Sequence, residues 1–285
     1  MLIDHIFPAV VAEKSTLQNR LLAEATANSL SGEVFGSVIT GVPERLINAG
    51  CFLDKMTGLW RYEFGVPYSI EKSHVWGTHM WVPVSKLFAA LYCAKTRLAD
   101  GKRTDYLARL ADPERHQAVL VEMIPPHKID PAIPLEFEVA GFGAGNHTID
   151  WVIRPEEDRI VLLDVKRRTT DFIQQAEEMA ADSSSQEPTH DPSLLFRSVE
   201  QKFVAANPDN QLQGVWIYTD IKQNEERLLF AFSALCVSRV HFVILGDWRS
   251  DAYVLSRRPE DRQFLLDLFR LKSSTRFTFR TENEG

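Results

Sequence analysis

The chain is poor in cysteine and has no long apolar run. Its 285 residues include 3 cysteines, Cys51, Cys93 and Cys236, which are widely separated and lack ligand-like spacing. This pattern excludes a disulfide framework and a zinc cluster, and it predicts a reduced, cytoplasmic protein. No apolar run approaches the length of a membrane span, and the N-terminus lacks a basic start before an apolar core. We therefore expect neither a membrane partner nor a signal peptide.

The chain also has a deficit of positive charge. Its 32 Lys and Arg residues stand against 39 Asp and Glu residues, which gives a formal net charge of −7. Broad, tight binding to duplex DNA through the overall field of the protein is excluded, because such binding depends on many neutralised phosphates. Any contact with a polyanion must therefore use a local basic cluster or a bridging metal ion.

Length and composition predict more than one folding unit. The chain exceeds one average domain, and 45% of its residues are hydrophobic, which is ample for a core. A polar stretch at residues 99–102 is typical of a boundary. We expect an N-terminal α+β region over residues 1–110 and a second domain over residues 111–285.

Two predicted strands, residues 147–153 and 160–168, each carry an acidic residue. Because side chains on a strand alternate between faces, Asp164 and Lys166 point the same way. A short polar turn joins the strands and predicts an antiparallel hairpin, whose register decides whether Asp150 lies level with Asp164. The apolar run before Asp164 is expected to be buried on both faces. A charge at its end must therefore be paired or hold an ion.

The Asp-x-Lys triplet alone carries little information. Chance gives roughly 1.5 acid-x-Lys triplets in a chain of this composition, and the sequence has them at Asp100, Asp164, Glu200 and Asp220. Only the triplet at Asp164 has a companion Asp on the preceding strand and a basic pair directly after it. A surface ion pair is the alternative interpretation, since such pairs are common and nearly neutral in energy.

The order of predicted elements resembles the αβββαβ core of the PD-(D/E)XK nuclease superfamily. The elements are a helix at 113–123, strands at 135–140, 147–153 and 160–168, a helix at 192–206 and a strand at 213–219. In that superfamily the first acid is matched here by Asp150, and the signature is matched by Asp164, Val165 and Lys166. The resemblance covers about residues 112–220. It implies an α/β, restriction-endonuclease-like fold with a mixed sheet, beside the N-terminal α+β region.

The resemblance also implies divalent-metal-dependent hydrolysis of nucleic acid, with DNA expected rather than RNA. Asp150 and Asp164, with the main-chain carbonyl of Val165, would hold Mg²⁺ or Mn²⁺, which prefer hard oxygen ligands. Lys166 would hold or help to deprotonate the attacking water. Many members have a further acid on the first core helix, for which Glu114 and Glu122 are both candidates. The sequence departs from the pattern because no Pro precedes Asp150.

Further residues are expected to bind the phosphates of nucleic acid. Arg167 and Arg168 directly follow the signature lysine, and a basic residue at the position of Arg168 is common in the superfamily. The helix at 192–206 carries Arg197, Gln201 and Lys202, which we place on a single face. Gln201 and Lys202 are candidates for nucleic-acid contact, although a solvated helix face is the more frequent explanation of such residues.

Two other functions fit the same pattern. A non-catalytic member of the fold would serve as a nucleic-acid-binding or protein-interaction module. A globular interaction protein would use the triplet as a surface ion pair. For the nuclease, cleavage of both strands by a one-site enzyme favours a two-fold homodimer.

The remaining glycine-rich and C-terminal segments predict structural elements. The run Gly141–Gly145 reads as a turn between two strands rather than a phosphate loop, because a strand and not a helix follows it. After the core, strands at 240–245 and 252–255 and a helix at 259–271 are expected to extend and cover the sheet.

Overall fold

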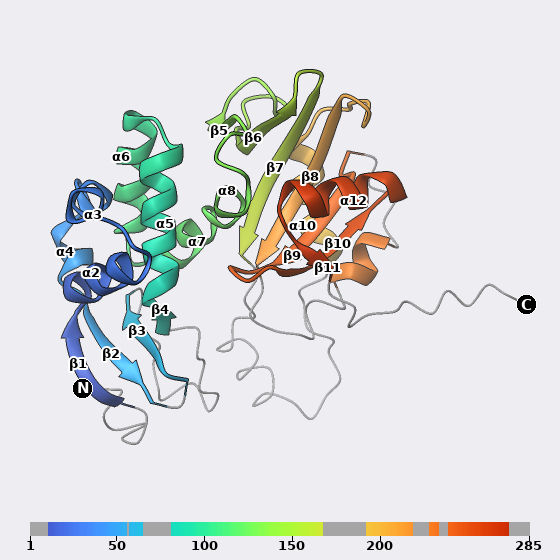
Figure 1. The fold of residues 1–285 in the computed structure, drawn as a ribbon. Coiled ribbons are helices and arrows are strands. Elements are labelled where there is room, and N and C mark those ends of the chain that lie inside the picture. The colour runs from blue at the N-terminus through green and yellow to red at the C-terminus, as the bar shows by residue number, and fades with distance from the viewer. Residues whose placement is uncertain are drawn as a thin grey trace, which may run out of the picture. The chain divides into compact units, whose positions relative to one another are not determined.

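The computed structural model describes residues 11–55, 57–64, 81–167, 192–218, 228–233 and 239–273. The chain divides into two compact units, whose described residues lie within 11–127 and 128–273. Each unit has its own sheet, so the architecture is mixed α/β (Figure 1). Within the described ranges, no helix combines the length and the apolar character needed to cross a bilayer.

The division between the units falls later than the sequence suggests. We expected it after residue 110, whereas residues 111–127 belong to the first unit. His116 explains this attachment, because it is fully buried and its Nε2 lies 2.8 Å from the hydroxyl oxygen of Tyr62. The Nδ1 atom of His116 also contacts the carbonyl oxygen of Leu110 at 2.5 Å. These contacts fix the segment to its own N-terminal neighbours.

The first unit combines an antiparallel sheet with short helices. Its strands are in sequence order, β1 (Val11–Thr16), β2 (Gly50–Asp54), β3 (Leu59–Glu63) and β4 (Trp81–Pro83). Its helices are α2 (Leu17–Ala27), α3 (Gly32–Ile39), α4 (Glu44–Ile47), α5 (Val84–Arg97), α6 (Asp100–Leu110) and α7 (His116–Val121), with α8 (Ile124–Lys128) at the boundary. Helix α5 buries Leu87, Leu91 and Ala94 at helical spacing. Its packing therefore follows from the apolar pattern of its sequence.

The second unit is built on a seven-stranded mixed sheet. In chain order the strands are β5 (Leu135–Val139), β6 (Ile149–Glu156), β7 (Arg159–Arg167), β8 (Gln211–Tyr218), β9 (Phe242–Gly246), β10 (Asp251–Ser256) and β11 (Lys272–Ser273). The spatial order is β11-β10-β9-β8-β7-β6-β5. Strands β5 to β7 are antiparallel, β7 to β9 are parallel, and β10 is antiparallel to β9. The predicted hairpin and the parallel strand that follows it are therefore present.

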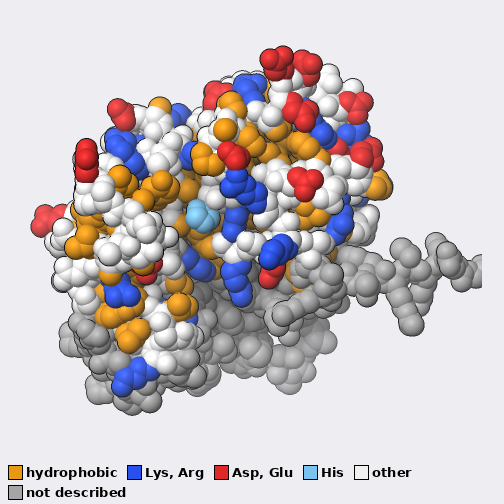
Figure 2. All heavy atoms as spheres, viewed as in Figure 1, with side chains coloured by type: hydrophobic (Ala, Val, Ile, Leu, Met, Phe, Trp, Pro, Cys, Tyr) orange, Lys and Arg blue, Asp and Glu red, His pale blue; other side chains and the backbone are white. Residues whose placement is uncertain are grey.

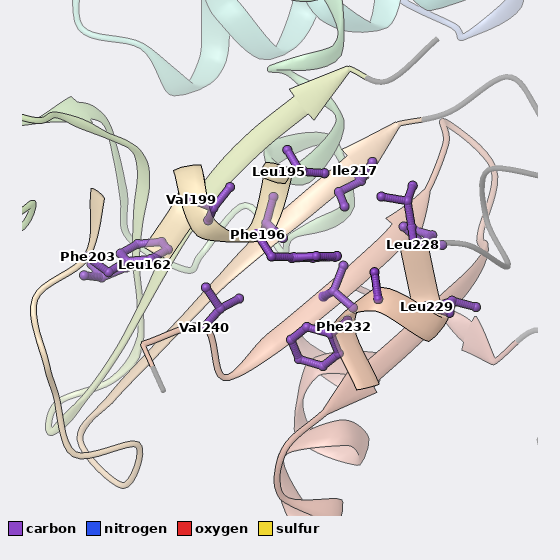
Figure 3. Packing of buried hydrophobic residues seen from close by; sticks show 14 of the residues in the cluster. Leu162, Leu195, Phe196, Val199, Phe203, Ile217, Leu228, Leu229, Phe232 and Val240 are labelled. Atoms are coloured by element: carbon purple, nitrogen blue, oxygen red, sulfur yellow. The ribbon is translucent and has the colours of Figure 1, made fainter. Parts of the chain in front are cut away.

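Helices cover both faces of this sheet. Helix α10 (Pro192–Lys202) and the helical residues 228–233 pack on one face, where Phe196 and Phe232 have ring centroids 5.6 Å apart (Figure 3). On the other face, Trp216 lies edge-on to Phe269, which directly follows α12 (Pro259–Leu268), at 5.3 Å. Because residues 215 and 217 on β8 face α10, alternation turns residue 216 toward α12. The central strands are thus buried on both sides, as continuous apolar runs require.

Candidate functional site

Strand β7 carries two charged side chains on the face that α10 covers. Asp164 and Lys166 follow the buried Leu162 at a spacing of two residues, so all three share this face. Asp164 is completely buried, and its Oδ2 lies 2.6 Å from the Nζ of Lys166. The expectation that the acid at the end of this apolar strand needs a partner is confirmed.

Strand β6 brings Asp150 level with Asp164. The antiparallel register pairs Trp151 with Leu163 and Val152 with Leu162, so that one step further Asp150 stands opposite Asp164. Directly opposed residues of an antiparallel pair point to the same face, with Cβ atoms about 5 Å apart. The main-chain N–H of Val165 donates a hydrogen bond to Oδ2 of Asp150 at 2.7 Å. The two acids predicted from the sequence therefore meet at one place.

Helix α10 contributes a second lysine. The Nζ of Lys202 donates a hydrogen bond to Oδ1 of Asp164 at 2.6 Å. Lys202 extends the buried stripe of α10, because it follows Leu195 and Val199 at helical spacing. The grouping of Lys202 with Gln201 and Arg197 on one face is wrong: those two side chains are exposed, whereas Lys202 is turned toward the sheet.

The turn between β5 and β6 holds the end of α10. The main-chain N–H of Ala144 donates to the carbonyl oxygen of Lys202 at 2.7 Å, and Gly143 forms a bridge with Phe203. A Cβ at Gly143 would lie 2.3 Å from the carbonyl oxygen of His147, so only glycine fits this close approach. The predicted turn at Gly141–Gly145 is confirmed, and it fixes the backbone that carries Lys202.

The charges of the site perturb each other. Burial, and then the negative charge of Asp164, raise the pKa of Asp150 from 3.8 to about 7, while Lys166 and Lys202 oppose this rise. Burial works against the charge of Lys202, but the carboxylate of Asp164 outweighs it and raises the pKa of this lysine above its ordinary value. Lys202 thus stays cationic, whereas Asp150 changes protonation state near neutral pH.

The oxygen atoms of the site suit a hard divalent cation. Oδ2 of Asp164 is buried and has no hydrogen-bond partner among the described residues, because the nearby Lys166 ammonium contacts it without hydrogen-bond angles. Asp150 and Asp164 supply carboxylate oxygens of the kind that Mg²⁺ and Mn²⁺ prefer. Val165 connects the two acids, because it follows Asp164 on β7 and its main-chain N–H binds Asp150. The described ranges contain no group of three or more His, Cys, Asp or Glu side chains with metal-ligand geometry. The carboxylates of Asp150 and Asp164 therefore fit such an ion only if main chain, water or substrate completes its ligand set.

Solvent reaches the site from the lysine side. The side chains of Lys166 and Lys202 are 26% and 23% exposed, although Asp164 is inaccessible. In Figure 2, Lys and Arg side chains gather beside the end of β7, and Asp and Glu side chains are concentrated at the β6–β7 turn, where residues 156–158 are exposed acids. The two ends of β7 therefore carry opposite charge.

The other predicted site residues are distributed differently. Arg167 is half-buried at the end of β7, and its Nη2 has no hydrogen-bond partner among the described residues. Arg168 lies outside the described residues. Glu114 and Glu122 belong to the first unit, where Glu122 forms an ion pair with Arg109 at 3.2 Å. Both glutamates therefore belong to a different unit from Asp150 and Asp164.

One further acidic residue lies beside the site and carries no signal in the sequence pattern. Glu138 on β5 stands opposite Asp150, because Phe137 pairs with Trp151 and Val139 with Ile149. Its φ of 49° is unusual for a residue other than glycine inside a strand and indicates local strain. Acidic residues at register positions on β5, β6 and β7 thus form a row across the sheet.

Comparisons with known proteins found no match: no family model and no curated protein matches the sequence, and no solved structure matches the fold.

Proposed function

We propose that the protein is a divalent-metal-dependent phosphodiesterase of nucleic acid, acting as a DNA endonuclease on a restriction-endonuclease-like core. The observation that carries the proposal is the meeting of Asp150, Asp164 and Lys166 on one face at the ends of β6 and β7. The succession of β5, β6, β7, α10 and β8, with β8 parallel to β7, supports the same core.

The proposed chemistry follows from the donors at this place. Asp150, Asp164 and the main-chain carbonyl of Val165 would hold Mg²⁺ or Mn²⁺. Such an ion lowers the pKa of bound water and neutralises charge that develops on a scissile phosphate. Lys166, which is partly exposed, would hold and orient the attacking water. Arg167 and Lys202 supply positive charge for the flanking phosphates.

A cleavage assay with a matched lysine control tests the proposal. Supercoiled plasmid and labelled oligonucleotides would be incubated with the full chain in Mg²⁺, Mn²⁺ or EDTA. We expect cleavage that needs the metal, that Lys166→Met abolishes, and that Lys272→Met leaves unchanged, since Lys272 is an exposed lysine of the same unit. Cleavage by Lys166→Met at the wild-type rate would assign the activity to a contaminant or another site.

A non-catalytic nucleic-acid-binding module is the second candidate. It is favoured by the two lysines that already neutralise Asp164, as in a purely structural ion cluster. This candidate predicts retention of DNA at low salt without products in any divalent metal.

In the catalytic case, light scattering is expected to show a two-fold dimer when both strands of a duplex are cut.

A further inference from the structure

The charges of the cluster at the end of β7 can balance without a metal ion. With both acids ionised, Asp150 and Asp164 carry two negative charges and Lys166 and Lys202 carry two positive ones. Each oxygen of Asp164 has an ammonium group at 2.6 Å. A divalent cation added to this buried group would leave it with excess positive charge, which is costly where water is excluded.

Lys202 and Lys166 are held differently. Lys202 makes a hydrogen bond with correct angles to Oδ1 of Asp164, whereas the contact of Lys166 with Oδ2 lacks hydrogen-bond angles. The ammonium of Lys202 therefore stands where a cation bound through Oδ1 would stand.

The geometry also shows how Lys202 can leave. Its side chain is 23% exposed, so a rotation of the side chain would bring the ammonium group into solvent. Its main chain is fixed by the hydrogen bond from Ala144 and by the close approach of Gly143. Departure of the ammonium from Asp164 therefore requires no movement of α10.

We infer that Lys202 is an internal cation that competes with the divalent metal for Asp164 and thereby sets the metal affinity of the site. This inference rests on the proposed metal-dependent function. In the absence of metal, Lys202 neutralises Asp164. Once metal is bound, the displaced ammonium is free for an anionic substrate.

Mn²⁺ binding to the full 285-residue chain tests the competition directly. Free Mn²⁺ would be measured by electron paramagnetic resonance in titrations of the wild type, Lys202→Met, Lys272→Met and Asp164→Asn. We expect Lys202→Met to bind Mn²⁺ 10- to 100-fold more tightly, the size expected when one charge-assisted hydrogen bond no longer has to be displaced. Lys272→Met should match the wild type, and Asp164→Asn should bind weakly.

The possible results separate the two hypotheses. Equal or weaker binding by Lys202→Met, with loss of binding in Asp164→Asn, would overturn the competition and leave the metal site intact. Unchanged binding in Asp164→Asn, or no binding by any variant, would overturn both the metal site and the competition. Lys202→Gln, which retains a hydrogen-bond donor without the charge, provides a second variant in case the methionine variant does not fold.

Chemical labelling of the wild type supplies a readout without mutation. The rate of acylation of each lysine would be measured by mass spectrometry with and without saturating Mn²⁺. Displacement from Asp164 is expected to increase the labelling of Lys202 and to leave Lys272 unchanged. A labelling rate of Lys202 that stays constant while Mn²⁺ binds would contradict the inference.

Discussion

Replacement of Asp150 by Asn is expected to stabilise the second unit, and more so at alkaline pH. Burial and the charge of Asp164 raise the pKa of Asp150 from 3.8 to about 7. Ionisation of this carboxyl therefore costs free energy in the folded protein, and no such cost arises in the unfolded chain. The difference of about 3 pKa units corresponds to about 4 kcal/mol above pH 7. Asn retains an acceptor for the main-chain N–H of Val165.

The sign of the pH dependence follows from the bound protons. Between about pH 4 and pH 7 the folded protein binds more protons at Asp150 than the unfolded chain does, so this group lowers the stability of the wild type as pH rises. The variant lacks this titration. Its stability relative to the wild type should therefore increase by about 2–3 kcal/mol between pH 5 and pH 8.

Urea unfolding in EDTA at pH 5 to pH 8 provides the measurement. Tryptophan fluorescence follows the second unit through Trp151 and Trp216, which are buried in its core, and the first unit through Trp60 and Trp81. Asp158→Asn is the matched control, since Asp158 is exposed at the β6–β7 turn and should give no comparable pH trend. The reasoning is refuted if the difference between Asp150→Asn and wild type is constant with pH, or if the variant is less stable at pH 8.

Two further substitutions test the architecture around the site. Gly143→Ala should destabilise the protein by about 1–3 kcal/mol, because the new Cβ would lie 2.3 Å from the carbonyl oxygen of His147; calorimetry should show no such loss for Gly101→Ala, which has open space, and equal losses would contradict the close approach. Asp261→Asn should cost about 3 kcal/mol in urea unfolding, because Asp261 is 1% exposed and binds two guanidinium groups, including that of Arg159 at 2.6 Å. A loss within about 0.5 kcal/mol would mean that this buried ion cluster contributes no stability.

Strand alternation explains why part of the site could be predicted from sequence. The spacing of Asp164 and Lys166 fixes their common face, and the polar turn before β7 favours an antiparallel hairpin. The register that brings Asp150 opposite Asp164 could not be predicted, because it depends on an irregularity in the pairing between Ile153 and Glu156. Local residue types do not specify such a shift.

The role of Lys202 could have been recognised from helix periodicity. Leu195 and Val199 are spaced as a buried stripe, and Lys202 continues it at three residues from Val199. Its neighbour Gln201 is exposed because adjacent helical residues differ by about 100° in direction. By contrast, a glutamate in the sequence does not indicate a positive φ, so the backbone strain at Glu138 could not be predicted.

The expected boundary after residue 110 and the observed one after residue 127 differ because the same residues can serve a linker or a helix. Residues 99–102 include two charged residues and a glycine, which is typical of a linker. An acidic residue such as Asp100 also favours the first turn of a helix, and α6 begins there. Sequence alone does not distinguish these two uses, since the difference depends on what the helix packs against later in the chain.

The tether between Ala144 and the carbonyl of Lys202 has a kinetic consequence. Rotations about the bonds of a lysine side chain take picoseconds to nanoseconds, whereas hinge movements of packed helices take microseconds or longer. With its Cα anchored, the displacement of the lysine that we propose would need only side-chain rotation, which belongs to the faster of these timescales. The rate at which an ion enters would then depend on how quickly that ion sheds its own hydration water, a step at which Mg²⁺ is slow.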